Sequence, residues 1–174
     1  MADENDVLTD LNQGEGAPNG ADNLPSAGII SQYVKDLSVE NPNAPSAFQW
    51  QDTPQLDVQF NIAANPVNEE VTEVELKITA TAKGEKGEFY IVELAYAGLV
   101  GMRNIPEEQG HAFLFAEAPR LLFPFARRVV SDAVQDAGFP ALTLDPIDFN
   151  GLYIQQLQAK RQQEAGGDMP TGNA

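Results

Sequence analysis

Few residues of this chain have the types and spacing that catalysis or metal binding requires. Its only histidine is His111, which has no nucleophile or metal-ligand partner at a matching spacing, so we expect it to be exposed or structural. The adjacent acids Glu69-Glu70 and Glu107-Glu108 are the pairs that acid–base chemistry could use, but solvated surface is the better interpretation. The segment from Gly84 to Gly87 lacks the GxxxxGK[ST] pattern of a phosphate loop and indicates a hairpin turn. We therefore expect no enzyme activity, no metal and no cofactor.

Composition narrows the classes of partner. The 174 residues include no cysteine, which excludes disulfides and thiolate chemistry. The formal net charge of −16 disfavours nucleic acid and anionic membranes and favours basic proteins or unfolded chains that carry positive charge. A signal peptide would require a basic residue near its start, but no basic residue precedes Lys35. No apolar run reaches the roughly 20 residues of a membrane span. The expectation is a cytoplasmic protein with no nucleic-acid partner and no membrane insertion.

One domain lies between two polar ends. Residues 1–27 are acidic, contain no lysine or arginine, and are rich in Gly, Asn and Pro, which predicts a disordered tail. Residues 166–174 are Gly-rich and predict a second disordered tail. We assign residues 28–165 to a single domain.

The elements that must position any site change type along the domain. Alternating or apolar segments predict four strands, joined without helices between them, which favours an antiparallel sheet; these strands are Ile29–Glu40, Gln55–Ala63, Val74–Thr79 and Phe89–Leu94.

Helical spacing follows. A helix is expected from about Pro119 to Gly138, with a kink or a later start at Pro124. A last helix is expected after Asp145, as its N-cap, and ends at Gly166. Strands first and helices second predict an α+β domain.

Aromatic and aliphatic residues are denser than one sheet-and-helix layer needs. The segment from Phe113 to Phe125 (FLFAEAPRLLFPF) adds to Phe48, Trp50, Phe89 and Tyr90. One interpretation is a core plus a subunit interface, and the other is an exposed apolar groove that binds polypeptide. Periodicity alone does not separate these two interpretations.

Four segments, in this order, resemble one known family, the SecB export chaperones. They cover Tyr33–Pro45 (YVKDLSVENPNAP), Phe89–Leu99 (FYIVELAYAGL), Glu117–Arg128 (EAPRLLFPFARR) and Gly138–Phe149 (GFPALTLDPIDF). Each string alone would be weak, but four in register are specific, and the likeness extends from about Ile30 to Leu157. Val100, where the family often has an aromatic, and the long acidic N-terminal tail depart from the pattern.

The resemblance implies a fold and a function. The fold is a four-stranded antiparallel sheet followed by two main helices, assembled as a dimer of dimers. The function is that of an ATP-independent holdase, which binds unfolded precursor polypeptides and delivers them to the SecA translocation motor for Sec-dependent export.

The resemblance also implies two sets of site residues. The SecA-binding positions are Asp36, Glu40, Ile91 and Glu93. Asp36 and Glu40 are four apart on a strand, hence on one face, and Glu93 is an acid inside an otherwise apolar strand. For the client groove, between the sheet and the helix after the long crossover, we take nine apolar candidates: Trp50, Leu56, Val58, Phe60, Phe113, Phe115, Leu122, Phe125 and Val129.

Three other classes stay open at this point. A small-ligand-binding α+β domain would enclose one ligand per chain. An oligomeric structural or adaptor protein would use its apolar surplus only between subunits and ignore unfolded chains. An enzyme comes last, because no catalytic set can be assembled. A relative specialised for toxin–antitoxin control is a variant of the chaperone hypothesis.

Overall fold

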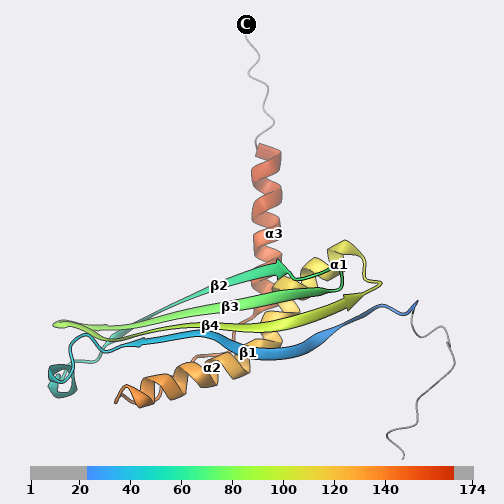
Figure 1. Ribbon diagram of the computed structural model, residues 1–174. Coiled ribbons are helices and arrows are strands. Elements are labelled where there is room, and N and C mark those ends of the chain that lie inside the picture. Colours follow the sequence, from blue (N-terminus) through green and yellow to red (C-terminus); the bar gives the residue numbers. More distant parts are fainter. Residues whose placement is uncertain (1–22, 167–174) are drawn as a thin grey trace, which may run out of the picture.

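A long antiparallel sheet forms the body of the protein, with helices on one face (Figure 1). The computed structural model describes residues 23–166, so the predicted tails lie almost wholly outside the described residues. The strands are β1 (Ser26–Glu40), β2 (Gln55–Pro66), β3 (Val71–Gly84) and β4 (Gly87–Arg103). Their order is β1-β4-β3-β2, and all neighbours are antiparallel. The predicted α+β class and the four-stranded sheet are confirmed.

Alternation in β3 shows why the sheet has two different faces. Its apolar side chains Val74, Leu76 and Ile78 are fully buried, whereas the alternate positions, such as Lys77, point the other way and are half-buried or exposed. We call the face of Leu76 and Ile78, which is covered by helices, the inner face, and the opposite one the outer face. Residues paired across strands share a face, so the register assigns every paired strand residue to one of them.

The strands are longer than the sequence predicted. β3 and β4 meet in a tight hairpin in which Gly84 pairs with Gly87, as expected, but β4 continues nine residues beyond Leu94, to Arg103. Its second half, Ala95–Gly101, is rich in Ala and Gly, which have low strand propensity. Pairing with neighbours on both sides holds this half in the sheet.

Helical structure begins earlier than predicted. It starts with α1 (Glu107–Ala112), continues through a π-helical turn (Phe113–Glu117) and runs into α2 (Ala118–Asp136). A later start at Pro124 is therefore wrong: α2 passes through this residue, because Leu122, Phe123 and Ala126 on either side of it are buried in the core. The predicted end is confirmed, since Gly138 follows the helix with a φ of +92°, a conformation that glycine adopts without strain.

The last helix starts three residues later than a helix capped by Asp145 would start. α3 spans Phe149–Gly166, and the Asp148 carboxylate accepts a hydrogen bond from the Gly151 N–H at 2.9 Å. Asp148 is thus the N-cap, and the prediction for Asp145 is wrong. Figure 1 shows α2 lying along the sheet and α3 standing away from it.

The core lies between the inner face and α2. The fully buried side chain of Leu122 packs so tightly onto β4 that a Cβ on Gly98 would lie 2.9 Å from Leu122 Cδ2. α2 packs mainly against β4, β3 and β1. Consequently β2, at the far edge, keeps part of its apolar inner face uncovered.

Candidate functional site

The sheet register brings the four acidic-site candidates together on the outer face. Glu40 pairs with Ile91, and Glu93 pairs with Ser38 on one side and Thr79 on the other. Asp36 pairs with Ala95. Asp36, Glu40 and Glu93 are exposed and Ile91 is half-buried. We call these four residues the acidic surface, and no ion pair within residues 23–166 involves any of its three acids.

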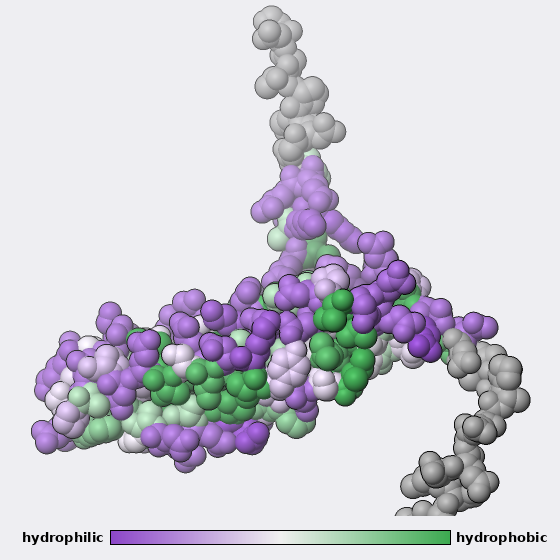
Figure 2. All heavy atoms as spheres, in the orientation of Figure 1, coloured by the Kyte–Doolittle hydropathy of each residue, from purple (hydrophilic) through white to green (hydrophobic). Residues whose placement is uncertain are grey.

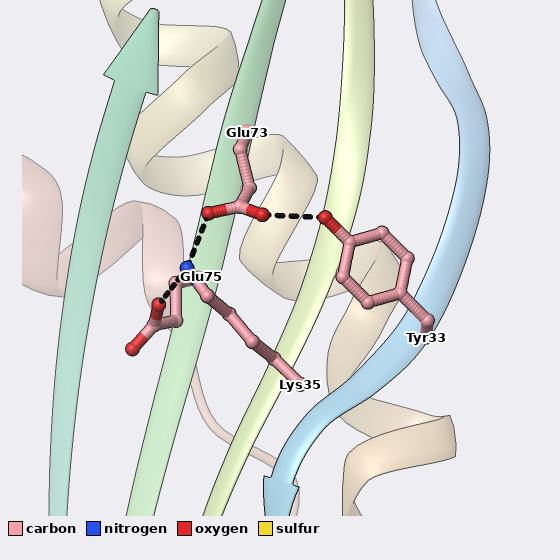
Figure 3. A network of polar contacts seen from close by, with 4 residues as sticks. All are labelled: Tyr33, Lys35, Glu73 and Glu75. Carbon is pink, nitrogen blue, oxygen red and sulfur yellow. Dashed lines mark hydrogen bonds and ion pairs between the residues drawn. The ribbon is translucent and has the colours of Figure 1, made fainter. Parts of the chain in front are cut away.

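A cross-strand network lies beside the acidic surface, on the same face (Figure 3). Lys35 Nζ lies 2.6 Å from Glu73 Oε1 and 3.0 Å from Glu75 Oε2. Tyr33 donates its hydroxyl hydrogen to the other oxygen of Glu73. We call these four residues the cross-strand network, because they join β1 to β3 over β4.

The network stabilises the charged forms of Glu73 and Lys35 and the neutral form of Tyr33. The Lys35 ammonium, and then the Tyr33 hydroxyl, hold the pKa of Glu73 below its ordinary value. The Glu73 carboxylate in turn raises the pKa of Tyr33, and the two carboxylates raise that of Lys35. Lys35 thus offsets part of the negative charge of Glu73 and Glu75, so the unpaired acids of the acidic surface dominate this face.

An apolar strip follows the inner face of β2. It consists of Leu56, Val58, Phe60 and Ile62, which pair with the fully buried or nearly buried residues of β3 from Ala82 to Leu76. Leu56 is 44% exposed and Phe60 is 38% exposed. At about 3.3 Å per residue the strip is about 20 Å long, the length of a short extended peptide segment.

A cavity of about 270 Å³ opens at one end of the apolar strip. Phe60 and Ile62 line it from β2, Phe115 from the π-helical turn, and Leu152 from α3. Ile62 and Leu152 were not among the predicted groove residues. The alternation of β2 could have indicated Ile62, whereas Leu152 is brought there only by the tertiary position of α3.

Two further groove candidates are half-buried. Trp50 is half-buried and packs edge-on against Phe89, with ring centroids 5.0 Å apart, near the hairpin end of the sheet. Phe113 is half-buried and packs against the core. Trp50, Leu56, Val58, Phe60, Phe113 and Phe115 stay predicted groove residues.

The structure separates the α2 candidates from the others. Leu122 is fully buried in the core, so its prediction as a groove residue is wrong. Phe123, rather than Phe125, faces Phe60, with ring centroids 6.1 Å apart. In a helix of 3.6 residues per turn, a residue two positions further on is rotated by about 200°, so Phe125 points away from the apolar strip. Val129 lies one turn after Phe125 and points in a similar direction.

Phe125 belongs to a second apolar surface, along the other edge of the sheet. Side chains of β1 and α2 that are between 36% and 45% exposed line it, and we call them the edge patch: Val34, Leu37, Val39, Leu121 and Phe125. Figure 2 shows hydrophobic residues in a band where β1 and α2 run side by side. The outer edge of β1 has no strand partner among residues 23–166.

His111 has a structural environment, as predicted. Its Nδ1 lies 2.7 Å from the Tyr153 hydroxyl, and its ring stacks on Phe115 with centroids 4.7 Å apart, so it ties α1 to α3. Residues 23–166 contain no cluster of three potential metal ligands. Glu70 pairs with Arg103 at 3.2 Å.

Among the described helices, none is long and apolar enough to cross a membrane.

Comparison with known proteins agrees with the residue-level resemblance. The sequence model of the family described as "Preprotein translocase subunit SecB" matches residues 20–160. The chain is 64% identical over 178 residues to the protein-export protein SecB of Erythrobacter litoralis, and 59% identical over 176 residues to that of Novosphingobium aromaticivorans. Both alignments cover 100% of this chain and of the relative.

A solved structure has the same fold at low sequence identity. It is a SecB-like chaperone of Mycobacterium tuberculosis in complex with a peptide from an antitoxin, with a TM-score of 0.58 and 18% identity. The match covers 70% of this chain and 90% of that one. Together with the full-length relatives, these matches place the chain in the SecB family, which is not an enzyme family, and its role is that of a protein-export chaperone.

Proposed function

We propose that the chain is a cytoplasmic, ATP-independent holdase that binds unfolded precursor polypeptides along the apolar strip of β2. The observation that carries this proposal is the uncovered inner face of β2, where Leu56 and Phe60 are more than one-third exposed beside a cavity lined by Phe115. Exposed apolar surface of this kind marks a binding site for apolar groups. A client segment that buries its side chains there gains about 1.5–3 kcal/mol for each large apolar residue.

The selectivity of such a site comes from the client's conformation. Ordering a flexible chain offsets much of the gain from burial, which leaves weak and sequence-tolerant binding at each site. A folded protein has its apolar runs buried and offers nothing to the strip. An unfolded precursor offers several segments at once.

Linked sites make this weak binding firm. We propose that the chain assembles as a homotetramer, a dimer of dimers, and that the edge patch forms contacts between copies. The free edge of β1 and its exposed apolar side chains Val34, Leu37 and Val39 support this, because an unprotected edge strand is a site of pairing with another chain. Several sites on one assembly raise the affinity for a long client by about 10²–10⁴-fold.

We propose that the acidic surface docks the SecA motor. Its three acids have no cation partner among the described residues, and Ile91 supplies an apolar centre. Acids that are not neutralised attract a basic protein surface and speed its association. The acidic surface and the apolar strip lie on opposite faces of the sheet, so client and motor can bind at the same time.

The experiment that tests the holdase function measures mass by light scattering on a sizing column. The protein is run alone and after mixing with a slow-folding precursor freshly diluted from urea. We expect a particle of about 75 kDa, four times the 18.8 kDa of one chain, that co-elutes with unfolded but not with folded precursor. An assembly that ignores the unfolded precursor would contradict the holdase function and favour a structural or ligand-binding role.

A further inference from the structure

β1 contains one residue more than its partner strand at the centre of the sheet. Tyr33 pairs with Ala97 and Asp36 pairs with Ala95, so three steps along β1 match two steps along β4. Lys35 is the extra residue, and the register shift around it is a β-bulge. A bulge bends its strand and re-aims the side chains that follow it.

This bulge decides which way the acids of β1 face. If the pairing of Val34 with Tyr96 continued without the bulge, Asp36 would lie opposite Leu94 and Glu40 opposite Tyr90. Leu94 and Tyr90 are buried on the inner face, so both acids would point at the core. A shift of one residue exchanges the two faces of a strand, and the bulge supplies that shift.

The cross-strand network holds the bulge from outside (Figure 3). Tyr33 precedes the bulge and Lys35 lies in it, and both reach over β4 to the carboxylate of Glu73. Between them lies Ala97, which is fully buried and pairs with Tyr33 on one side and Glu75 on the other. A larger residue at Ala97 would stand in the way of the side chains that cross there.

We propose that Tyr33 and Lys35 are positioning residues for the acidic surface: anchored on Glu73 and Glu75, they fix the bulge that presents Asp36 and Glu40 to a basic partner. This inference rests on the proposed docking of SecA at the acidic surface. It assigns to Lys35 a role that its charge alone would contradict, because a lysine beside an acidic docking site repels a basic partner.

The opposite signs of these two effects allow a sharp test. If Lys35 acts only as a nearby positive charge, Lys35→Met strengthens SecA binding. If Lys35 positions the acids, Lys35→Met weakens it. Lys77 is the matched control, since it is exposed on the same face, opposite Ala95, which also pairs with Asp36. No ion pair involves Lys77 among the described residues.

The measurement is the dissociation constant of purified SecA for the intact assembly, by titration calorimetry at fixed salt. We expect Lys35→Met to weaken binding about three- to fivefold, the range set by an exposed ion-pair network. We expect Lys77→Met to strengthen SecA binding up to about twofold. This is the effect of removing one positive charge that repels a basic group of SecA from about 10 Å away. Lys35→Arg, which keeps the cation and its reach, should restore the wild-type value.

Two further measurements keep the inference testable if Lys35→Met disturbs the assembly. Tyr33→Phe removes only the hydroxyl that bonds Glu73 and changes no charge at neutral pH, so it should weaken SecA binding about twofold. Amide exchange at Asp36 and Leu37 should be faster in both variants, with mass and client binding unchanged. If Lys35→Met binds SecA as tightly as Lys77→Met does, the positioning role is overturned. If wild-type protein does not bind SecA, the docking proposal itself fails, which is a different result.

Discussion

Glu93 is an exposed acid in a strand whose neighbouring side chains are apolar and buried. It lies in β4 between Val92 and Leu94, which are fully buried on the inner face, but its own side chain is exposed on the outer face. An acid at this position adds nothing to the core, and it has no ion-pair partner among the described residues. Its position next to Ser38 of β1 puts it within the acidic surface, the docking site that we propose for SecA.

Reversing this charge tests the acidic surface directly. We expect Glu93→Lys to weaken SecA binding by about tenfold or more, since like charges at an interface are repelled, while oligomer mass and client affinity stay unchanged. Glu164→Lys, on the exposed end of α3, makes the same change in net charge away from the sheet and should bind SecA as the wild type does. Unchanged SecA affinity in Glu93→Lys would remove this residue from the contact.

The ionisation of Glu73 predicts a dependence of stability on pH. Its pKa in the folded protein is lower than the ordinary value of 4.5, so its contribution is complete above pH 4.5 and is lost as the pH falls through the lower, folded value. Glu73→Gln should therefore lower the free energy of unfolding by a constant amount above that pH and by less below it. Denaturant unfolding of both proteins at one protein concentration measures this difference. The effect is small, because the network lies at the surface, and a difference that grows with acidification would contradict it.

At the scale of elements, the local sequence pattern predicted the types and the order of the helices and strands, but not the register in which the strands pair. The alternation in β2 and β3 was sufficient to place Leu56, Val58 and Phe60 on one face. The bulge at Lys35 has no local signal, because it is fixed by contacts with β3 that lie 38 and 40 residues away. Asp36 and Glu40 do share a face, as their spacing predicted, but which face they share depends on that bulge.

Helix α2 shows a similar limit. Helical spacing predicted this helix, but the period alone does not say which of the groove candidates Leu122, Phe125 and Val129 meet the sheet. The structure buries Leu122 against β4 and leaves Phe125 44% exposed. Tertiary packing also carries α2 through Pro124, where propensity favours an end.

The apolar strip of β2 makes an element-scale prediction. We expect Leu56→Ser combined with Phe60→Ser to weaken binding of an unfolded precursor by about tenfold or more, since each large apolar contact contributes about 1.5–3 kcal/mol when buried. Both side chains are more than one-third exposed, so the fold should lose little. Val67→Ser is the matched control, because Val67 is 59% exposed in the turn after β2, outside the strip. Fluorescence anisotropy of a labelled, reduced precursor measures the affinity. Equal binding by the double variant and the control would exclude the apolar strip as the client-binding site.

At the scale of the whole molecule, three surfaces occupy different sides of one sheet. The acidic surface lies on the outer face, the apolar strip lies along the β2 edge of the inner face, and the edge patch lies along β1 at the opposite edge. We expect the proposed assembly through the edge patch to leave the acidic surface accessible, because Leu37 and Val39 face inward whereas Asp36 and Glu40 face outward. The sequence indicated a surplus of apolar residues but not its division into two surfaces, because that division depends on where α2 crosses the sheet.

The proposed assembly through the edge patch can be broken by one charge. Leu37 is 43% exposed on β1, so Leu37→Lys should be tolerated in the folded chain but not in an apolar contact between copies. We expect light-scattering mass to fall below about 75 kDa, to a multiple of 18.8 kDa smaller than four. Val67→Lys adds the same charge at a more exposed site outside the edge patch and should keep the full mass. Affinity for a long precursor should fall by at least about tenfold as linked sites are lost, whereas affinity for a peptide that fills a single strip should stay the same. If the mass of Leu37→Lys falls but its affinities for the long precursor and for the peptide both persist, each protomer holds its client alone. If the mass is unchanged, the copies do not meet at Leu37.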